Sequence, residues 1–120
     1  MSPTSPQRST STIEHVQGVP VVAIIGRLDT QNASAFDAQT AVLLAQPCPR
    51  ILLDMQSMTY ISSMGLRSIL MLIKHAAVNG GRAGAFSVPP MVLEVLEISG
   101  FPTLMDIFSD RESALNGVRA

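Results

Sequence analysis

Short apolar runs recur along this chain, separated by polar or glycine-containing segments. Val21–Ile25 is an unbroken apolar run closed by Gly26, and Ile51–Leu53 is a second run that finishes in the polar Asp54. Runs of this length, bounded by turn-forming or polar residues, are typical of buried strands. Residues 83–88 are expected to form a third buried strand, so the chain is predicted to have three core strands.

Two weaker segments predict strands at the margins of the sheet. Thr12–Val16 has the pattern of a short, partly exposed strand. The tight turn at Gly18-Val19-Pro20 predicts that this strand forms an antiparallel hairpin with the first core strand. Leu104–Phe108 is the expected last strand of the chain.

The most hydrophobic helix is expected shortly after the second core strand. Apolar residues recur there with the spacing of a buried helix face, and Asn79-Gly80-Gly81 supplies residues that commonly end a helix. The residues of this expected face are Leu66, Ile69, Leu70, Ile73 and Ala77.

Three further helices are predicted from their end signals. Asp29–Asn32 supplies N-cap candidates for a helix that Pro47 ends. Pro90 suits the first turn of another helix, where its missing N–H is not needed. Ser109–Glu112 matches a capping box ahead of the last helix.

The order of these elements, β-β-α-β-α-β-α-β-α, indicates the α/β class. We expect a mixed, mostly parallel β-sheet with an N-terminal antiparallel hairpin and about four α-helices packed on it. The start of the chain is rich in Ser, Thr and Pro, which predicts a flexible N-terminal tail over residues 1–12. Residues 13–120 are then expected to form one domain.

Composition and charge exclude several classes of function. The formal net charge is −1, which provides no electrostatic attraction for nucleic acid or for an anionic membrane. Arg67 and Lys74 bracket the most hydrophobic stretch, so no apolar run has transmembrane length. The tail lacks the apolar region of a secretory signal, and a cytoplasmic location is expected.

The residues that usually bind metals or act in catalysis are sparse. Cys48 is the only cysteine, so neither an intrachain disulfide nor a thiolate metal cluster can form. His15 and His75 are not spaced as metal ligands, and neither has an obvious partner acid. We therefore expect no metal, no cofactor and no enzymatic activity. A hydrolase with Ser63 as nucleophile is disfavoured because the Gly-x-Ser-x-Gly elbow is absent.

The junction over residues 54–67 is the richest candidate site. It joins a buried strand to the most hydrophobic helix, and functional groups of parallel α/β folds collect at such junctions. Ser62 and Ser63 fall at the start of the helix, where a serine is usually an ordinary N-cap. The same helix start has free N–H groups and a positive dipole end, which tolerate a phosphate on a serine. Gly65 allows another backbone to approach the first turn closely.

The junction over residues 54–67 and several other segments resemble those of the STAS-domain anti-sigma factor antagonists (anti-anti-sigma factors). The segments that carry the resemblance are Leu53–Met55, Tyr60–Arg67, Gly26–Asp29, Ile98–Phe101 and Ile107–Phe108. They follow one another in the family's order and cover nearly the whole chain. The resemblance implies a STAS fold and a non-catalytic role in protein–protein interaction.

The family resemblance also implies a phosphorylation-controlled partner switch that regulates transcription. The unphosphorylated protein would bind a serine kinase/anti-sigma factor, phosphorylation by that kinase would break the complex, and a serine phosphatase would restore it. In the family the phosphorylated serine lies two positions before the glycine of the motif. The resemblance therefore implies that this chain is a phosphoprotein with Ser63 as its phosphorylation site.

The resemblance further suggests which residues contact the partner. Ser62 stands where many members have Asp, and Met64 stands where Ser or Ala is common. Arg67, one helical turn along, would pair with the phosphate or with an acidic partner, or would simply be solvated. The residues expected to bind the partner are Asp29, Ser62, Met64, Gly65 and Arg67.

Two alternatives remain open from the sequence. Some STAS domains are thought to bind nucleotides or other small ligands near this helix start, although no glycine-rich phosphate loop accompanies it here. A purely scaffolding role within a larger complex is the second alternative.

Overall fold

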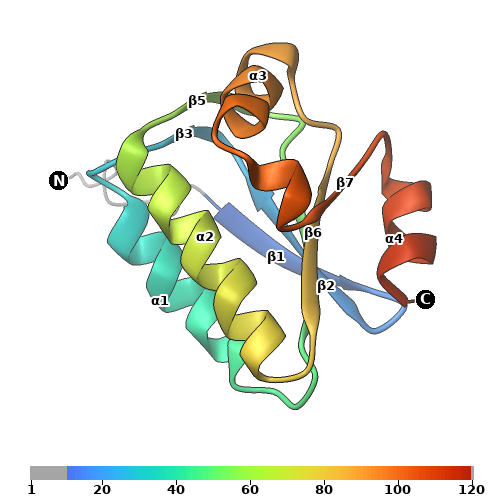
Figure 1. Cartoon of the computed structure of the whole chain (residues 1–120). Helices are drawn as coiled ribbons and strands as arrows, with labels where there is room; N and C mark the ends of the chain where they lie inside the picture. The colour runs from blue at the N-terminus through green and yellow to red at the C-terminus, as the bar shows by residue number, and fades with distance from the viewer. Residues whose placement is uncertain (1–10, 120) are drawn as a thin grey trace, which may run out of the picture.

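The computed structural model describes residues 11–119, which form one mixed sheet, one small parallel sheet and the helices around them (Figure 1). The strands are β1 (Ser11–Val16), β2 (Val19–Ile24), β3 (Gly26–Leu28), β4 (Arg50–Asp54), β5 (Met58–Ile61), β6 (Arg82–Phe86) and β7 (Asp106–Phe108). The helices are α1 (Ala33–Leu44), α2 (Ser63–Val78), α3 (Pro90–Ile98), the 3-10 helix η2 (Phe101–Thr103) and α4 (Arg111–Arg119).

The main sheet has the order β1-β2-β4-β6-β7. β1 and β2 pair antiparallel, with Val16 opposite Val19, whereas the other neighbours pair parallel. Gln17 and Gly18 both have positive φ, 53° and 83°, which matches the twist of a two-residue hairpin turn. The expected hairpin and the parallel core are therefore confirmed.

Helices cover both faces of this sheet. Figure 1 shows α1 and α2 side by side on one face and α4 on the other. Side chains of β4 alternate accordingly: Ile51 and Leu53 pack among residues of α1, α2 and α3, whereas Leu52 packs among residues of α4. Because both faces are covered, the core strands are continuous apolar runs, as is usual for parallel sheets.

The small sheet was missed in the sequence. β3 and β5 pair in parallel, with Arg27 opposite Tyr60 and Leu28 opposite Ile61. The segment that follows Asp54 was expected to be only a loop. These strands escape detection because they are three and four residues long and β5 exposes its two central side chains. They still bury Leu28 completely, so the small sheet belongs to the core.

Several element boundaries differ from the sequence prediction. α4 is capped by Asp110, whose Oδ1 accepts a hydrogen bond from Ser113 N at 2.8 Å, so the capping box predicted at Ser109–Glu112 is shifted by one residue. This bond also holds the pKa of the Asp110 carboxyl below its usual value. The last strand begins at Asp106, because η2 occupies the chain shortly before it.

The inner face of α2 is displaced slightly from the expected one. Ile69 and Ile73 are buried as predicted, Leu66 and Leu70 are partly buried against the core, and Ala77 is exposed. The other buried residues of this helix are Gly65, Ser68, Leu72 and Ala76. At the start of the chain, Ser11 and Thr12 belong to β1, and the rest of the expected tail lies outside the described residues.

Because helices cover both faces of the sheet, we expect two adjacent residues of β4 to contribute equally to stability. Leu52→Ala and Leu53→Ala each remove a fully buried side chain, on opposite faces. Each should lower the free energy of unfolding by about 2–5 kcal/mol, measured by urea denaturation. Leu104→Ala is the matched control: this leucine is 49% exposed, and the loss should stay below about 1 kcal/mol. A small loss at either Leu52 or Leu53 would contradict the three-layer packing.

Candidate functional site

The candidate site is the start of α2, where β5 passes into the helix. Ser62 has an extended backbone (φ −95°, ψ 176°) and is the N-cap. Its Oγ accepts a hydrogen bond from Gly65 N at 3.2 Å, and its carbonyl accepts one from Leu66 N at 2.9 Å. A capping serine satisfies N–H groups that have no partner within the helix. The hydroxyl of Ser62 is therefore committed to the fold.

Gly65 brings this helix start against the end of β3. A Cβ at this position would lie 2.4 Å from the carbonyl oxygen of Leu28 and 2.9 Å from Cγ1 of Ile61. The same Leu28 carbonyl accepts a hydrogen bond from Ser62 N at 3.0 Å. Gly65 is buried and has no side chain to offer a partner, so its structural contribution is to permit this close contact.

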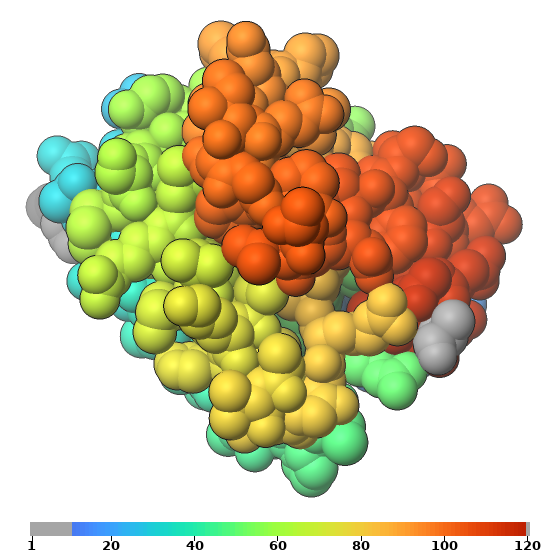
Figure 2. Space-filling view, viewed as in Figure 1, coloured from blue at the N-terminus to red at the C-terminus, as the bar shows by residue number. Residues whose placement is uncertain are grey.

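Ser63, the first residue of α2, faces solvent. Within residues 11–119 its hydroxyl has no hydrogen-bond partner, and the backbone N–H groups of Ser63 and Met64 donate to no acceptor. These N–H groups lie at the positive end of the helix dipole, which favours negative charge. In Figure 2 the first turns of α2, in yellow-green, reach the surface of the face shown. Ser63 thus combines solvent exposure with a helix start that favours negative charge.

Asp29 lies just beyond β3, beside this helix start. Its Oδ2 accepts a hydrogen bond from Arg27 Nε at 3.0 Å, and its Oδ1 accepts one from Gln31 N at 3.0 Å. The guanidinium of Arg27 holds the pKa of the Asp29 carboxyl below its ordinary value. Its contacts tie Asp29 into the turn between β3 and α1, and its charge is balanced by that of Arg27.

Arg27 and Tyr60 complete the surface around the site. The guanidinium carbon of Arg27 lies 4.3 Å from the centre of the Tyr60 ring, a cation–π contact. Both side chains are accessible, 61% for Arg27 and 43% for the whole of Tyr60. Sequence reasoning missed this pair, because only the β3–β5 pairing places the two residues opposite each other.

The structure gathers the sequence-predicted site residues around the helix start. Ser62, Ser63, Met64 and Gly65 form the cap and first turn of α2, and Asp29 follows the strand that packs against that turn. Met64 is 43% exposed, whereas Met58, at the start of β5, is buried. Arg67, one turn further along α2, is exposed and forms no ion pair with any described residue.

Two further properties concern metals and membranes. Within residues 11–119, no three His, Cys, Asp or Glu side chains lie close enough together to hold a metal ion. None of the helices in the same range has both the length and the apolar character needed to cross a membrane.

Comparisons with known proteins identify the family. The family model described as STAS domain matches residues 10–114. The chain belongs to the STAS domain family. BtrV of Bordetella bronchiseptica, whose name describes it as a candidate anti-sigma factor antagonist, is 31% identical over 103 residues, spanning 86% of this chain and 89% of that protein. An anti-sigma F factor antagonist of Paenibacillus polymyxa is 29% identical over 104 residues, spanning 86% and 89%.

Solved STAS structures share the fold. An anti-sigma factor antagonist from Mycobacterium paratuberculosis superposes with a TM-score of 0.84 at 21% identity, covering 98% of this chain and 99% of that one. The antagonist SpoIIAA in its unphosphorylated form gives 0.78 at 22% identity, covering 91% and 96%. Bacillus SpoIIAA in the phosphorylated form gives 0.72 at 20% identity, covering 91% and 99%. The α/β STAS fold expected from the sequence is confirmed.

The contact between Gly65 and Leu28 predicts an unusual response to alanine. In an open helix, Gly→Ala stabilises by about 1 kcal/mol. Gly65→Ala should instead lower the free energy of unfolding by about 1–3 kcal/mol, because the new Cβ would overlap the Leu28 carbonyl. Urea denaturation measures the change. Ser34→Ala, in the first turn of α1 and exposed, is the control and should shift stability by less than about 0.5 kcal/mol. Stabilisation by Gly65→Ala would contradict the observed contact.

Proposed function

We propose that this STAS protein is an anti-sigma factor antagonist that acts by phosphorylation-controlled partner switching. In its unphosphorylated form it binds a serine kinase/anti-sigma factor through the surface around the start of α2. Phosphorylation of Ser63 by that kinase ends the interaction, and a serine phosphatase restores it. The role is one of binding rather than catalysis, and partners that act on transcription fit the cytoplasmic location expected from the sequence.

The observation that carries this proposal is the exposed hydroxyl of Ser63 beside a neighbouring serine that is already used as the cap. Ser62 holds the helix start through its bond to Gly65 N. Ser63 has no structural contact through its hydroxyl within the described residues, so it is available for modification without loss of the cap. The curated relatives named as anti-sigma factor antagonists support the same assignment.

The surroundings of Ser63 suggest why a phosphate would end binding. Met64 and Tyr60 present accessible apolar surface, and Arg27 and Asp29 balance each other's charge. A partner that covers such a surface removes from water apolar side chains and an ion pair whose two charges already balance each other. A phosphate adds nearly two negative charges, which are costly to desolvate against a docked protein.

The same surroundings suggest that the domain itself tolerates the phosphate. The unpaired N–H groups and the dipole of α2 favour an anion at this position. Arg67 follows Ser63 at the i+4 spacing, so the two side chains lie on the same face of the helix. We propose that Arg67 contacts the phosphate in one state and an acidic group of the partner in the other.

A phosphomimetic variant tests the proposal. Ser63→Asp should leave the free energy of unfolding unchanged or raise it by about 0.3–1 kcal/mol, because the carboxylate sits at a helix N-terminus. It should weaken binding to the purified kinase/anti-sigma factor by at least about tenfold, because like charges or desolvation oppose docking. Calorimetric titration measures the affinity.

Ser109→Asp is the matched control for the added charge. Ser109 is also exposed and lies just ahead of α4, a helix on the opposite face of the sheet from α2. Binding of this variant should match that of the unmodified protein. Equal affinity of the kinase for the Ser63→Asp variant and the unmodified protein would overturn the proposed switch.

A further inference from the structure

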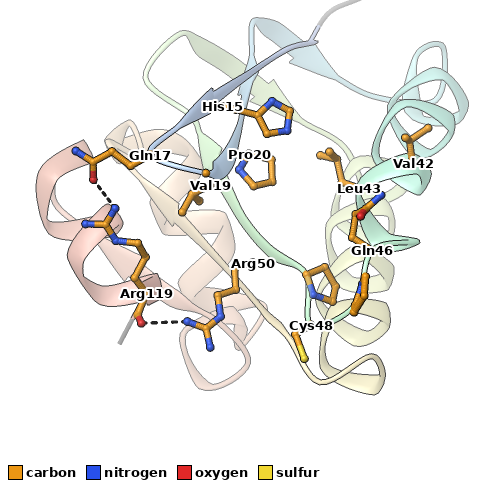
Figure 3. A pocket seen from close by; sticks show the side chains of 13 residues that line it. His15, Gln17, Val19, Pro20, Val42, Leu43, Gln46, Cys48, Arg50 and Arg119 are labelled. Atoms are coloured by element: carbon orange, nitrogen blue, oxygen red, sulfur yellow. Dashed lines mark hydrogen bonds between the residues drawn. The ribbon is translucent and has the colours of Figure 1, made fainter.

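A recessed region lies at the other end of the sheet from Ser63. Its volume is about 720 Å³, within the range of small-molecule sites, which is roughly 300–1,000 Å³. The β1–β2 turn, the end of α1, the loop that leads into β4 and the last residue of α4 line it (Figure 3). β4 begins with Arg50 at this cavity and ends with Asp54 near the start of β5, so the cavity and the candidate switch lie at opposite ends of the strand.

One side of the cavity is apolar and built from stiff parts. Val42 and Leu43 from the last turn of α1 face the cavity together with three prolines, Pro20, Pro47 and Pro49. Figure 3 shows Val42 and Leu43 on the side opposite Arg119. Val42 is 67% exposed at the mouth of the cavity, so a bound apolar group could remove this side chain from water. Proline rings fix the backbone angle φ, so this wall is largely pre-formed.

The other side of the cavity is basic. Arg50 and Arg119 lie there, and His15 borders the cavity from β1. Neither Asp nor Glu occurs among the described residues that line it. The cavity therefore combines an apolar wall with a basic side formed by Arg50, Arg119 and His15, and no carboxylate of residues 11–119 lines it.

The ion pairs of the described residues separate arginines that a carboxylate balances from those that none balances, and the two cavity arginines share the second class with Arg67 of α2. Arg27, Arg82 and Arg111 each pair with at least one carboxylate. Arg50 and Arg119 pair with none in the part of the chain that the structure describes.

The hydrogen bonds of these two arginines leave donors free. Arg50 Nη1 donates to the carbonyls of Val118 and Arg119 at the end of α4, and Arg119 Nη1 donates to the neutral Gln17 side chain. Within residues 11–119, Nε and Nη2 of both guanidinium groups remain without an acceptor. A guanidinium carries five N–H donors in a geometry that matches a carboxylate.

We propose that this cavity binds a small amphipathic carboxylate, with its apolar body against Val42, Leu43 and the prolines and its carboxylate at Arg50 and Arg119. Charge complementarity selects the anionic head group, and the apolar wall selects the hydrocarbon body. The inference is independent of the partner switch, because the cavity shares no residue with the site at the start of α2.

Titration of the full chain with decanoate, followed by calorimetry and by amide NMR shifts, tests the proposal. Decanoate should bind saturably at one site, with the largest shifts at Val19, Leu43 and Arg50 and none at Ser63. Decan-1-ol, which has the same chain without the charge, should bind at least about tenfold more weakly, corresponding to about 1.4 kcal/mol. Equal affinity for the acid and the alcohol would overturn the role of the arginines.

Two matched variants locate the site. Val42→Glu places a negative charge and a polar group at the mouth of the cavity, and it should lower decanoate affinity at least about tenfold. Val78→Glu is the control: Val78 is 81% exposed and is the last residue of α2, just as Val42 lies in the last turn of α1. Its affinity should equal that of the unmodified protein, and the NMR spectrum reports whether each variant is folded. The proposal would be overturned if decanoate binding did not saturate or if the largest NMR shifts lay on α2. It would also be overturned if both variants lost decanoate affinity equally.

Discussion

The carbonyl oxygen of Leu28 accepts a hydrogen bond from Ser62 N and lies in direct contact with Gly65, and the position of Ser63 depends on this contact. One hydrogen bond contributes about 0.5–1.5 kcal/mol, and a serine cap contributes about 1 kcal/mol. Full burial of Leu28 contributes about 1.5–3 kcal/mol, so apolar packing of the small sheet supplies the larger share. The hydrogen bond to Ser62 N and the absence of a side chain at Gly65 then determine how closely the first turn of α2 packs against the end of β3.

The main sheet separates two chemically different ends of the molecule. At the carboxyl end of β4, the surface around Ser63 has accessible apolar side chains and an internally balanced Arg27–Asp29 pair. At the amino end of the same strand, Arg50 borders a cavity in which no described carboxylate balances the arginines. A rigid sheet covered on both faces keeps these ends apart. Each end can therefore change its contacts without rebuilding the core.

Much of the fold follows from sequence periodicity. The three apolar runs became β2, β4 and β6, and the hairpin, the four helices and the parallel pairing were predicted correctly. β3 and β5 were not predicted, because strands of three and four residues have too few alternating positions to differ from a loop. The cap of α4 was misplaced by one residue, because Ser109 and Asp110 are both good caps and only the structure distinguishes them.

The candidate site was predictable in part. The serine pair before an apolar helix and the glycine two residues later were visible in the sequence, and Ser62 is the cap, as a serine in that place usually is. The contact of Arg27 with Tyr60 was not visible, since it depends on the unpredicted β3–β5 pairing. The cavity near Arg50 combines three stretches that are far apart in the sequence, residues 15–20, residues 42–50 and Arg119, and no local pattern of spacing brings them together.

Phosphate transfer to the chain is the most direct test of the account. The unmodified protein, Ser63→Ala and Ser62→Ala are incubated with ATP and candidate serine kinases from the same genome, and intact-mass spectrometry counts the phosphates added. The account predicts one phosphate on the unmodified protein and on Ser62→Ala, whose missing hydroxyl serves only as the helix cap. It predicts none on Ser63→Ala. A phosphate retained by Ser63→Ala, or no phosphate on the unmodified protein with any of the kinases, would contradict it.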